Sequence, residues 1–600
     1  MDLQPFHPRN NTLRSMLSAL LTCGSIACSD DADPVRNLDA AAVTPGALDG
    51  AVASSSSSAT ATGDAAAAAS PLDAAVAPLS VRPNILLLVA DDLGYSDIGA
   101  YGGEINTPNL DTLAAEGRLL TGHHSAATCS PTRSMLISGT DHHLVGLGTM
   151  AELLQPEQQG KPGYEGYLNQ KSLSIAQLLQ DSGYHTYIAG KWHLGLTEDK
   201  SPKAWGFESS YVLTSGAASH FAPRAGAPTP SEAVVYRENG VQTTVPSDFY
   251  STNFYTDKLI SYLDAHAGDG KPFFAFAAYT APHWPLQAPD DFLDRYRGRY
   301  DAGYDAIRAA RLARQKQLGI IPEDFQPNPG LPASDTNPKW ETLSADQRQL
   351  EARHMEIYAA MVENLDHNIG RIIQYLKRTG QYDNTFVFFE SDNGAEAGSG
   401  FPDTGADNSL ANLGHVGSNV NYGKRWAEVS ATPFRLWKAY SAEGGVSVPA
   451  IARLPRSVSA SKAFKGLSHV SDLAPTFLEL AHAPDPGSNY KGRDVYPITG
   501  HSLLPVLEER ASSVRAPGEV LVDELFGRRY VRKDQWKLTW IETPYGLSNW
   551  QLYDIDRDRG ETTDVSTQQP DVFNALTGEW DKYVTRVGVV LPQTPGTPGR

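Results

Sequence analysis

Residues 126–140 have the sequence AATCSPTRSMLISGT, and the organisation of the chain follows from this stretch. Ser130 is a residue type that caps helices, Pro131 suits the first helical position, and Gly139 suits the position just past the end. A helix is therefore predicted to begin directly after Cys129. The unpaired N–H groups and the dipole at a helix N-terminus favour an anion, so Cys129 is expected where negative charge is stabilised.

Cys129 and Arg133 belong to the pattern C-x-P-x-R. Arg133 lies one helical turn beyond Cys129, and its planar guanidinium matches the oxygens of an oxyanion. On its own, a cysteine before a capped helix is more often an ordinary buried residue. Three further blocks surround the pattern: SDIGAYGGEINTPNLDTLAAEG (96–117), GTDHHLVGLGTMAE (139–152) and GKWHLG (190–195).

With these blocks the chain resembles the type I, formylglycine-dependent sulfatases, and especially bacterial arylsulfatases of the Pseudomonas type, within the alkaline phosphatase superfamily. The resemblance extends from about Pro83 to the C-terminus. It implies an alkaline-phosphatase-like sandwich fold. It also implies that a formylglycine-generating enzyme oxidises Cys129 to formylglycine, an aldehyde whose hydrate acts as the nucleophile.

Composition limits the partners of the chain. The 600 residues include 41% hydrophobic and 20% charged residues, a globular composition in a chain too long for one ordinary domain. The net charge of −19 argues against a nucleic-acid partner, because binding phosphates needs a basic face. A local cationic pocket still permits a small anionic substrate. Apart from Cys129, the cysteines are Cys23 and Cys28, which leaves the folded part without an internal disulfide.

Residues 1–28 are predicted to be an export signal. Two arginines precede an apolar run, Met16–Ala27, that is too short to span a bilayer as a helix. The run ends in Ser-Ile-Ala-Cys-Ser, which resembles a bacterial lipoprotein cleavage box with Cys28 as the lipidated residue; Cys23 is a competing candidate. The alternative is an N-terminal extension that is apolar by chance. The signal predicts an exported bacterial lipoprotein, in the periplasm or on the outer membrane or cell surface, with a lipid anchor as its one membrane contact.

The next segment, residues 29–80, is rich in Ala, Ser and Asp and has almost no aromatic residues. Such a segment cannot bury enough apolar surface to offset its ordering entropy, so we expect a disordered linker. From Arg82 onward the sequence alternates between buried strands and helices, beginning with the apolar run 84–90 and a helix from Pro108. The alternation continues as helix–strand pairs at 174–181 with 184–189, 254–265 with 272–279, and 345–377 with 384–390.

We therefore expect residues 81–515 to form an α/β catalytic domain around a large, mostly parallel central sheet. A tight turn at Glu-Gly-Gly is predicted to lead into a strand at 446–454, and 469–481 is predicted to be a core helix. Residues 516–600 differ, with strand-like runs at 520–523, 529–532, 536–541 and 551–554 and a helix near 570–585. This pattern predicts a small C-terminal antiparallel sheet with a packing helix.

Polar side chains follow several of the predicted strands. In an open α/β sheet, ligands bind beyond the carboxyl ends of the strands, so these side chains are expected to meet at one edge. Asp91 and Asp92 follow the first strand, and Asp392 and Asn393 follow a later one. Three carboxylates and an amide oxygen suit Ca²⁺ or Mg²⁺ better than zinc. The resemblance implies that these four residues are metal ligands, completed by an oxygen of the formylglycine made from Cys129.

Four further residues are expected at the same edge. Lys191 and His193 flank a tryptophan in an extended segment, and an extended backbone would point both side chains the same way. The resemblance implies that Lys191 and Lys438 bind sulfate oxygens. It implies that His193 assists release of sulfate and that His283 protonates the leaving group, a task that suits an imidazole near neutral pH. Arg435 lies close to Lys438 in sequence and competes for its assignment.

The sequence therefore predicts an arylsulfatase that hydrolyses sulfate monoesters, either of small molecules or of glycans, to an alcohol or phenol and sulfate. One rival is a phosphonate monoester or phosphodiester hydrolase of the same superfamily. Another is a non-catalytic surface-binding protein, which the complete set of site residues disfavours. Four further histidines are predicted to be structural or to lie at the rim of the pocket: His123, His124, His142 and His143.

Overall fold

A computed structural model describes residues 82–223, 234–334, 336–398, 405–457 and 462–594. The predicted leader (1–28) with Cys23 and Cys28, and the predicted linker (29–80), lie outside the described residues, so these boundaries stay predictions. In the described part of the chain, no helix combines the length and the apolar character needed to cross a bilayer.

The described residues form a central sheet of nine strands in the order β2-β10-β9-β1-β8-β4-β5-β6-β7. Its five middle strands are parallel: β9 (Thr385–Ser391), β1 (Asn84–Asp91), β8 (Phe273–Pro282), β4 (His185–Lys191) and β5 (Ser209–Leu213). At both sides of the sheet, each outer strand pairs antiparallel with its neighbours. These outer strands are β2 (Arg118–Leu119), β10 (Ala450–Arg453), β6 (Tyr236–Glu238) and β7 (Val241–Thr243). The predicted mostly parallel sheet is confirmed.

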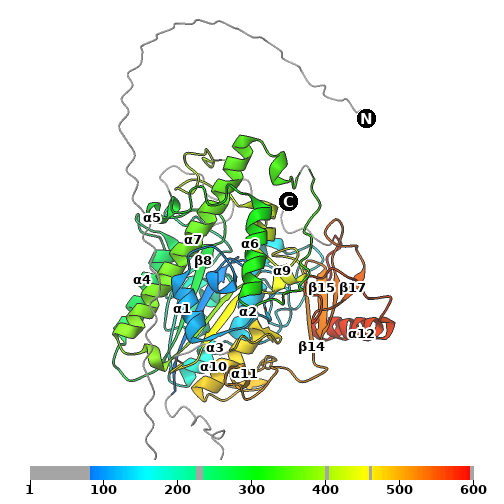
Figure 1. The fold of residues 1–600 in the computed structure, drawn as a ribbon. Coiled ribbons are helices and arrows are strands. Elements are labelled where there is room, and N and C mark those ends of the chain that lie inside the picture. The colour runs from blue at the N-terminus through cyan, green and yellow to red at the C-terminus, as the bar shows by residue number, and fades with distance from the viewer. Residues whose placement is uncertain (1–81, 224–233, 335, 399–404, 458–461, 595–600) are drawn as a thin grey trace, which may run out of the picture. The chain divides into compact units, whose positions relative to one another are not determined.

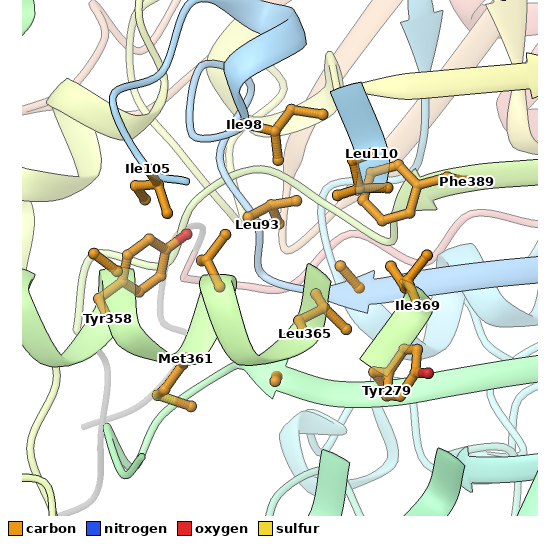
Figure 2. Packing of buried hydrophobic residues seen from close by; sticks show 14 of the residues in the cluster. Leu93, Ile98, Ile105, Leu110, Tyr279, Tyr358, Met361, Leu365, Ile369 and Phe389 are labelled. Atoms are coloured by element: carbon orange, nitrogen blue, oxygen red, sulfur yellow. The ribbon is translucent and has the colours of Figure 1, made fainter. Parts of the chain in front are cut away.

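Helices cover both faces of this sheet because its central strands are apolar on both sides. Along β1, Leu86 and Leu88 pack into one core cluster while Leu87 and Val89 pack into another. One cluster includes α1 (Pro108–Glu116), α4 (Ser251–Ala265) and α7 (Ala345–Arg378). The other includes α2 (Cys129–Ser138), α3 (Ile175–Asp181) and α10 (Leu473–Ala481). Figure 1 shows α7 running across the molecule, and Figure 2 shows α7 side chains packed against Leu93 and Tyr279.

Shorter elements complete the catalytic part. They are α5 (Asp290–Leu293), α6 (Tyr304–Gln317), α8 (Gly423–Ser430), α9 (Glu443–Val446), α11 (Leu504–Leu507), and the two-residue strands β3 (His123–His124), β11 (Ser468–His469), β12 (Asn489–Tyr490) and β13 (Arg493–Asp494).

Two local predictions were wrong. The helix of the Cys129 pattern begins at Cys129 itself, because the extended Thr128 accepts the first backbone hydrogen bond from Thr132, and Ser130 is therefore not its N-cap. The predicted strand at 446–454 is shortened to β10, because the preceding Glu-Gly-Gly forms the helical turn α9 instead of a tight turn. A Cβ at Gly445 would lie 2.0 Å from a backbone carbonyl oxygen, so this turn requires glycine.

The C-terminal part is a four-stranded antiparallel sheet with one helix packed on it, as predicted. Its strands are β14 (Val520–Leu525), β15 (Arg528–Lys533), β16 (Trp536–Trp540) and β17 (Trp550–Asp554), and the helix is α12 (Pro570–Val587). Figure 1 shows these elements together in orange and red. Lys537, fully buried in β16, pairs at 2.9 Å with Glu443 of the catalytic part. The sheet is therefore anchored through buried charge as well as apolar contact.

Candidate active site

The carboxyl ends of β1 and β9 bring the four predicted metal ligands to Cys129, at the start of α2. The Cys129 Sγ lies 3.3 Å from Asp91 Oδ1 and 3.9 Å from Asp92 Oδ1. Asp92 also accepts a 2.7 Å hydrogen bond from Asn393 Nδ2, and its backbone N–H lies 3.3 Å from Asp392 Oδ1. All five side chains are buried. Residues separated by some 300 positions in the chain thus form one cluster, as the strand-end pattern predicted.

Basic side chains surround these carboxylates. Lys191 Nζ lies 2.7 Å from Asp91 Oδ2, and Lys438 Nζ lies 2.8 Å from Asp92 Oδ1. Arg133 donates from Nε to Asp392 Oδ2 at 2.8 Å. Arg435, the competing candidate for Lys438, instead pairs with Glu561 at 2.8 Å, outside the cluster.

The electrostatics of the cluster favour an additional cation. Burial, together with the neighbouring Asp91 carboxylate, raises the pKa of Asp392 to about 7. Burial opposes ionisation of Asp91 too, but Lys191, His283 and Arg133 hold the pKa of that carboxyl well below its ordinary value. At Asp392, burial and the Asp91 charge therefore outweigh the stabilisation that Arg133 and Lys191 give to the ionised carboxylate.

The residues fit a hard divalent cation. Asn393 Oδ1 is a buried oxygen that has no hydrogen-bond partner among the described residues, and it points to a missing ligand. Three carboxylates and this amide oxygen are the donor set that Ca²⁺ and Mg²⁺ prefer. Asp91, Asp92 and Cys129, with His283, also form one of the groups of metal-ligating side chains within 4.8 Å of one another.

The Cys129 thiol is poorly suited to act as a nucleophile itself. Burial, followed by the carboxylates of Asp392 and Asp91, raises the pKa of this thiol well above its ordinary value. The thiolate, not the thiol, is the reactive form of cysteine. The surroundings of Cys129 therefore disfavour the thiolate and do not activate an unmodified cysteine.

His193 lies at a backbone turn that the sequence did not indicate, and within the described part of the chain its side-chain hydrogen bond is with Glu152 and not with the cluster around Cys129. Its φ is 57°, so the predicted extended geometry from Lys191 to His193 is wrong at the second residue. His193 Nε2 lies 3.0 Å from Glu152 Oε1, while its Nδ1 is buried without a hydrogen-bond partner among the described residues. A Cβ at Gly216 would lie 2.7 Å from the ring, so glycine there leaves room for the imidazole.

Sequence reasoning missed Glu152 as a partner of His193. The residue ends the block 139–152, which was the one available signal. Burial would raise its pKa, but the neighbouring His193 outweighs burial and lowers the pKa of Glu152 to about 2. Glu152 is therefore a carboxylate that holds the imidazole.

His283 follows β8 and lies beside the carboxylates. Its Nε2 is 3.4 Å from Asp92 Oδ2, and its Nδ1 is 2.6 Å from the carbonyl oxygen of Trp284. Burial, and then the Lys438 ammonium, lower the pKa of His283 well below its ordinary value. His220, which the sequence did not single out, lies 2.8 Å from the His283 carbonyl through its Nε2 and fixes this turn.

The four histidines that were predicted to be structural each lie beside a buried carboxylate. His123 pairs with Glu390 at 2.7 Å, and His124 with Glu443 at 3.3 Å. His142 and His143 pair with Asp523 and Glu524 of β14, at 2.7 and 3.1 Å. The second pair of histidines thus joins the catalytic part to the C-terminal sheet.

The fold and the site together define a hydrolase of the alkaline-phosphatase-like class, with carboxylates and cationic side chains gathered around the cysteine of C-x-P-x-R. The family model described as "Sulfatase" matches residues 83–483, and the chain belongs to this family. The protein is a sulfuric ester hydrolase.

Similar proteins agree with this assignment. An uncharacterised sulfatase of Schizosaccharomyces pombe is 42% identical over 529 residues, which cover 85% of this chain and 95% of that protein. An arylsulfatase of Klebsiella aerogenes is 37% identical over 444 residues, covering 72% and 94%. The crystal structure of Ps i-CgsB aligns with a TM-score of 0.59 at 25% identity, covering 84% of this chain and 93% of that one.

Proposed function

We propose that the protein hydrolyses aryl sulfate monoesters through a formylglycine made from Cys129. The observation that carries this proposal is the position of Cys129 Sγ, 3.3 Å from Asp91 Oδ1 inside a ring of buried carboxylates and cations. The thiol pKa, raised by burial, argues that the unmodified side chain is not the nucleophile. The hydrate of the aldehyde would supply the attacking oxygen and a second hydroxyl, whose deprotonation releases sulfate.

Asp91, Asp92, Asp392 and Asn393 would hold one Ca²⁺ or Mg²⁺. When bound, the ion would add positive charge beside the nucleophile and lower the pKa of the hydrate. The orphaned Asn393 Oδ1 and the raised pKa of Asp392 support this assignment.

The remaining side chains would bind the sulfate group and move protons. Lys191, Lys438 and Arg133 would contact the non-bridging sulfate oxygens, where negative charge is held in the transition state. As the sulfur–oxygen bond to the substrate breaks, the imidazolium form of His283 would donate a proton from Nε2 to the departing phenol oxygen. Because Nδ1 is hydrogen-bonded to the Trp284 carbonyl, this doubly protonated form is the one with a proton at Nε2, and the negative charge of a bound sulfate would favour it. His193 would then take the proton of the remaining hydroxyl, and Glu152 would stabilise the imidazolium that forms.

The aryl substrate rests on the 37% identity with the Klebsiella aerogenes arylsulfatase. A sulfated glycan is the alternative, because solved relatives of the same fold include Ps i-CgsB in complex with a neocarrahexaose and a protein in complex with D-glucosamine-2-N,6-O-disulfate. The formylglycine-generating enzyme is the proposed maturation partner. Export with a lipid on Cys28 is proposed from the leader sequence alone.

The sulfatase and phosphonate-hydrolase activities are separated by kcat/KM for 4-nitrophenyl sulfate and for a matched phenyl phosphonate ester and phosphodiester. The Lys191 ammonium and the His193 imidazole favour the sulfate, and we expect a preference of at least ~10²-fold, about 2.7 kcal/mol of differential transition-state stabilisation. Lys191→Ala should narrow this preference. A wild-type preference for the phosphonate ester would contradict the proposed function.

A further inference from the structure

A second group of metal-ligating side chains lies at the other end of the central sheet. His185 begins β4, whereas Lys191 of the active site ends it, a span of about 20 Å at ~3.3 Å per residue. His266 and Asp269 follow α4, and one ligand atom from each of the three residues lies within 4.8 Å of the other two. We propose that His185, His266 and Asp269 bind one divalent cation of the Zn²⁺ type, apart from the active site.

The spacing of the ligand atoms suits a small ion. His185 Nε2 lies 2.7 Å from Asp269 Oδ2, and His266 Nδ1 lies 3.7 Å from the same oxygen. Ligands of a tetrahedral zinc ion at 2.0–2.1 Å are about 3.3 Å apart, a value between these two distances. The cation would replace the proton that His185 Nε2 shares with Asp269, and small side-chain movements would equalise the distances.

The group also has the outer hydrogen bonds that hold metal ligands in place. Glu208 Oε2 lies 2.7 Å from His185 Nδ1, the ring nitrogen that faces away from Asp269. A carboxylate on the far nitrogen fixes the tautomer of a metal-bound histidine and makes the ring a stronger ligand. The other oxygen of Asp269, Oδ1, accepts the backbone N–H of Lys271 at 2.9 Å. Two of the three ligands are thus already oriented.

This group of side chains is accessible to an ion from solvent. The side chains of His266 and Asp269 are 43% and 36% exposed, whereas that of His185 is 7% exposed. The His266 ring stacks on the His185 ring at 4.2 Å, so binding requires this exposed ring to turn, which is a fast motion at a surface. A fourth ligand position remains open to water.

The chemistry of this zinc-type site differs from that of the active site. Two imidazoles and one carboxylate favour Zn²⁺ and neighbouring transition metals, whereas the all-oxygen set around Asp392 favours Ca²⁺ or Mg²⁺. An ion here would join the end of α4 to the start of β4. It would stabilise the folded chain, because anything that binds the folded state alone does so.

The test is isothermal titration of the full chain with Zn²⁺ in millimolar Ca²⁺. We expect His266→Ala to weaken binding of one Zn²⁺ equivalent by at least ~10²-fold, and Glu208→Gln to weaken it by about 10–100-fold. His501→Ala is the matched control, because His501 is also 43% exposed and pairs with Glu519 at 2.6 Å, but it belongs to none of the metal-ligating groups of the described residues. This control should bind Zn²⁺ as the wild type does.

A second readout separates binding from folding. Circular dichroism of His266→Ala without metal should match the wild type, and sulfate ester hydrolysis in Ca²⁺ should be unchanged, because the residue lies at the opposite end of the sheet. Zn²⁺ should raise the Tm of the wild type and of His501→Ala but leave that of His266→Ala unchanged. Equal Zn²⁺ stoichiometry and affinity in the wild type and His266→Ala would overturn the proposal, as would equal affinity of the alanine variants of His266 and His501.

Discussion

The contact between Glu152 and His193 gives a quantitative prediction about turnover. Glu152→Gln keeps the size of the side chain but removes the charge that lies 3.0 Å from His193 Nε2. We expect kcat for an aryl sulfate to fall by about 10²-fold, with KM changed by less than about 3-fold, because the carboxylate interacts more strongly with the imidazolium formed during turnover than with the neutral ring, and such a difference affects kcat.

The magnitude follows from the pKa of Glu152. His193 outweighs the effect of burial and holds that pKa at about 2, against an ordinary 4.5. At 1.36 kcal/mol per pKa unit, this difference corresponds to about 3 kcal/mol in favour of the charged carboxylate. If most of it acts on the imidazolium formed when His193 takes a proton, its loss corresponds to about 10²-fold in rate.

The same pKa fixes the sign of a stability effect. Because the pKa of Glu152 is lower in the folded state, its contribution is fully present above about pH 4.5 and is lost as the pH falls toward 2. The free energy of unfolding of Glu152→Gln should therefore lie below that of the wild type at pH 7, by at most about 3 kcal/mol. The difference should shrink as the pH falls from 4.5 toward 2, which urea unfolding at several pH values can measure.

The assay is a double-mutant cycle in kcat with His193→Ala, and Glu152→Asp is the conservative control. If Glu152 acts through His193, the double variant should be no slower than His193→Ala alone, and Glu152→Asp should recover part of the rate. Losses that simply multiply in the double variant, or a raised KM with an unchanged kcat, would show that Glu152 does not act through His193.

Three other predictions concern the ion, the C-terminal sheet and the leader. Elemental analysis should find one Ca²⁺ or Mg²⁺ per active site, and Asp392→Ala should lose both this ion and activity; two zinc ions at the active site would instead favour the phosphatase branch. Lys537→Met should lower the free energy of unfolding by about 3–5 kcal/mol, because it removes a cation from two buried carboxylates, Glu443 and Glu561. The control Lys582→Met, at an exposed position, should change the free energy of unfolding by less than about 0.5 kcal/mol. Cys28→Ala should release the protein from membrane fractions in a host that lipidates it, and uncleaved soluble wild type in the native cytoplasm would refute the anchor.

Much of the fold was predictable because local patterns carried the information. The apolar run 84–90 required cover on both faces, and β1 does pack into two separate clusters. Alternating strands and helices then placed Asp91 and Asp392 at one sheet edge, where the structure brings them together around Cys129. Because these strands are parallel, the residues that follow them lie at the same edge of the sheet and form one site.

The remainder depended on contacts that no local pattern encodes. Lys438 could be separated from Arg435 only in three dimensions, since the first faces Asp92 and the second faces Glu561. The left-handed backbone of His193 and its partner Glu152 were missed, because a non-glycine residue with positive φ is uncommon and the pair is 41 residues apart.

Mass spectrometry of the peptide that contains Cys129, taken from protein of measured aryl sulfatase activity, tests whether this residue is the precursor of the nucleophile. We predict that the aldehyde form, lighter than the cysteine form, is present and that its fraction follows the specific activity across preparations. Cys129→Ala should be folded and inactive. Fully active protein in which Cys129 is entirely unmodified would exclude this residue as the precursor of an aldehyde nucleophile.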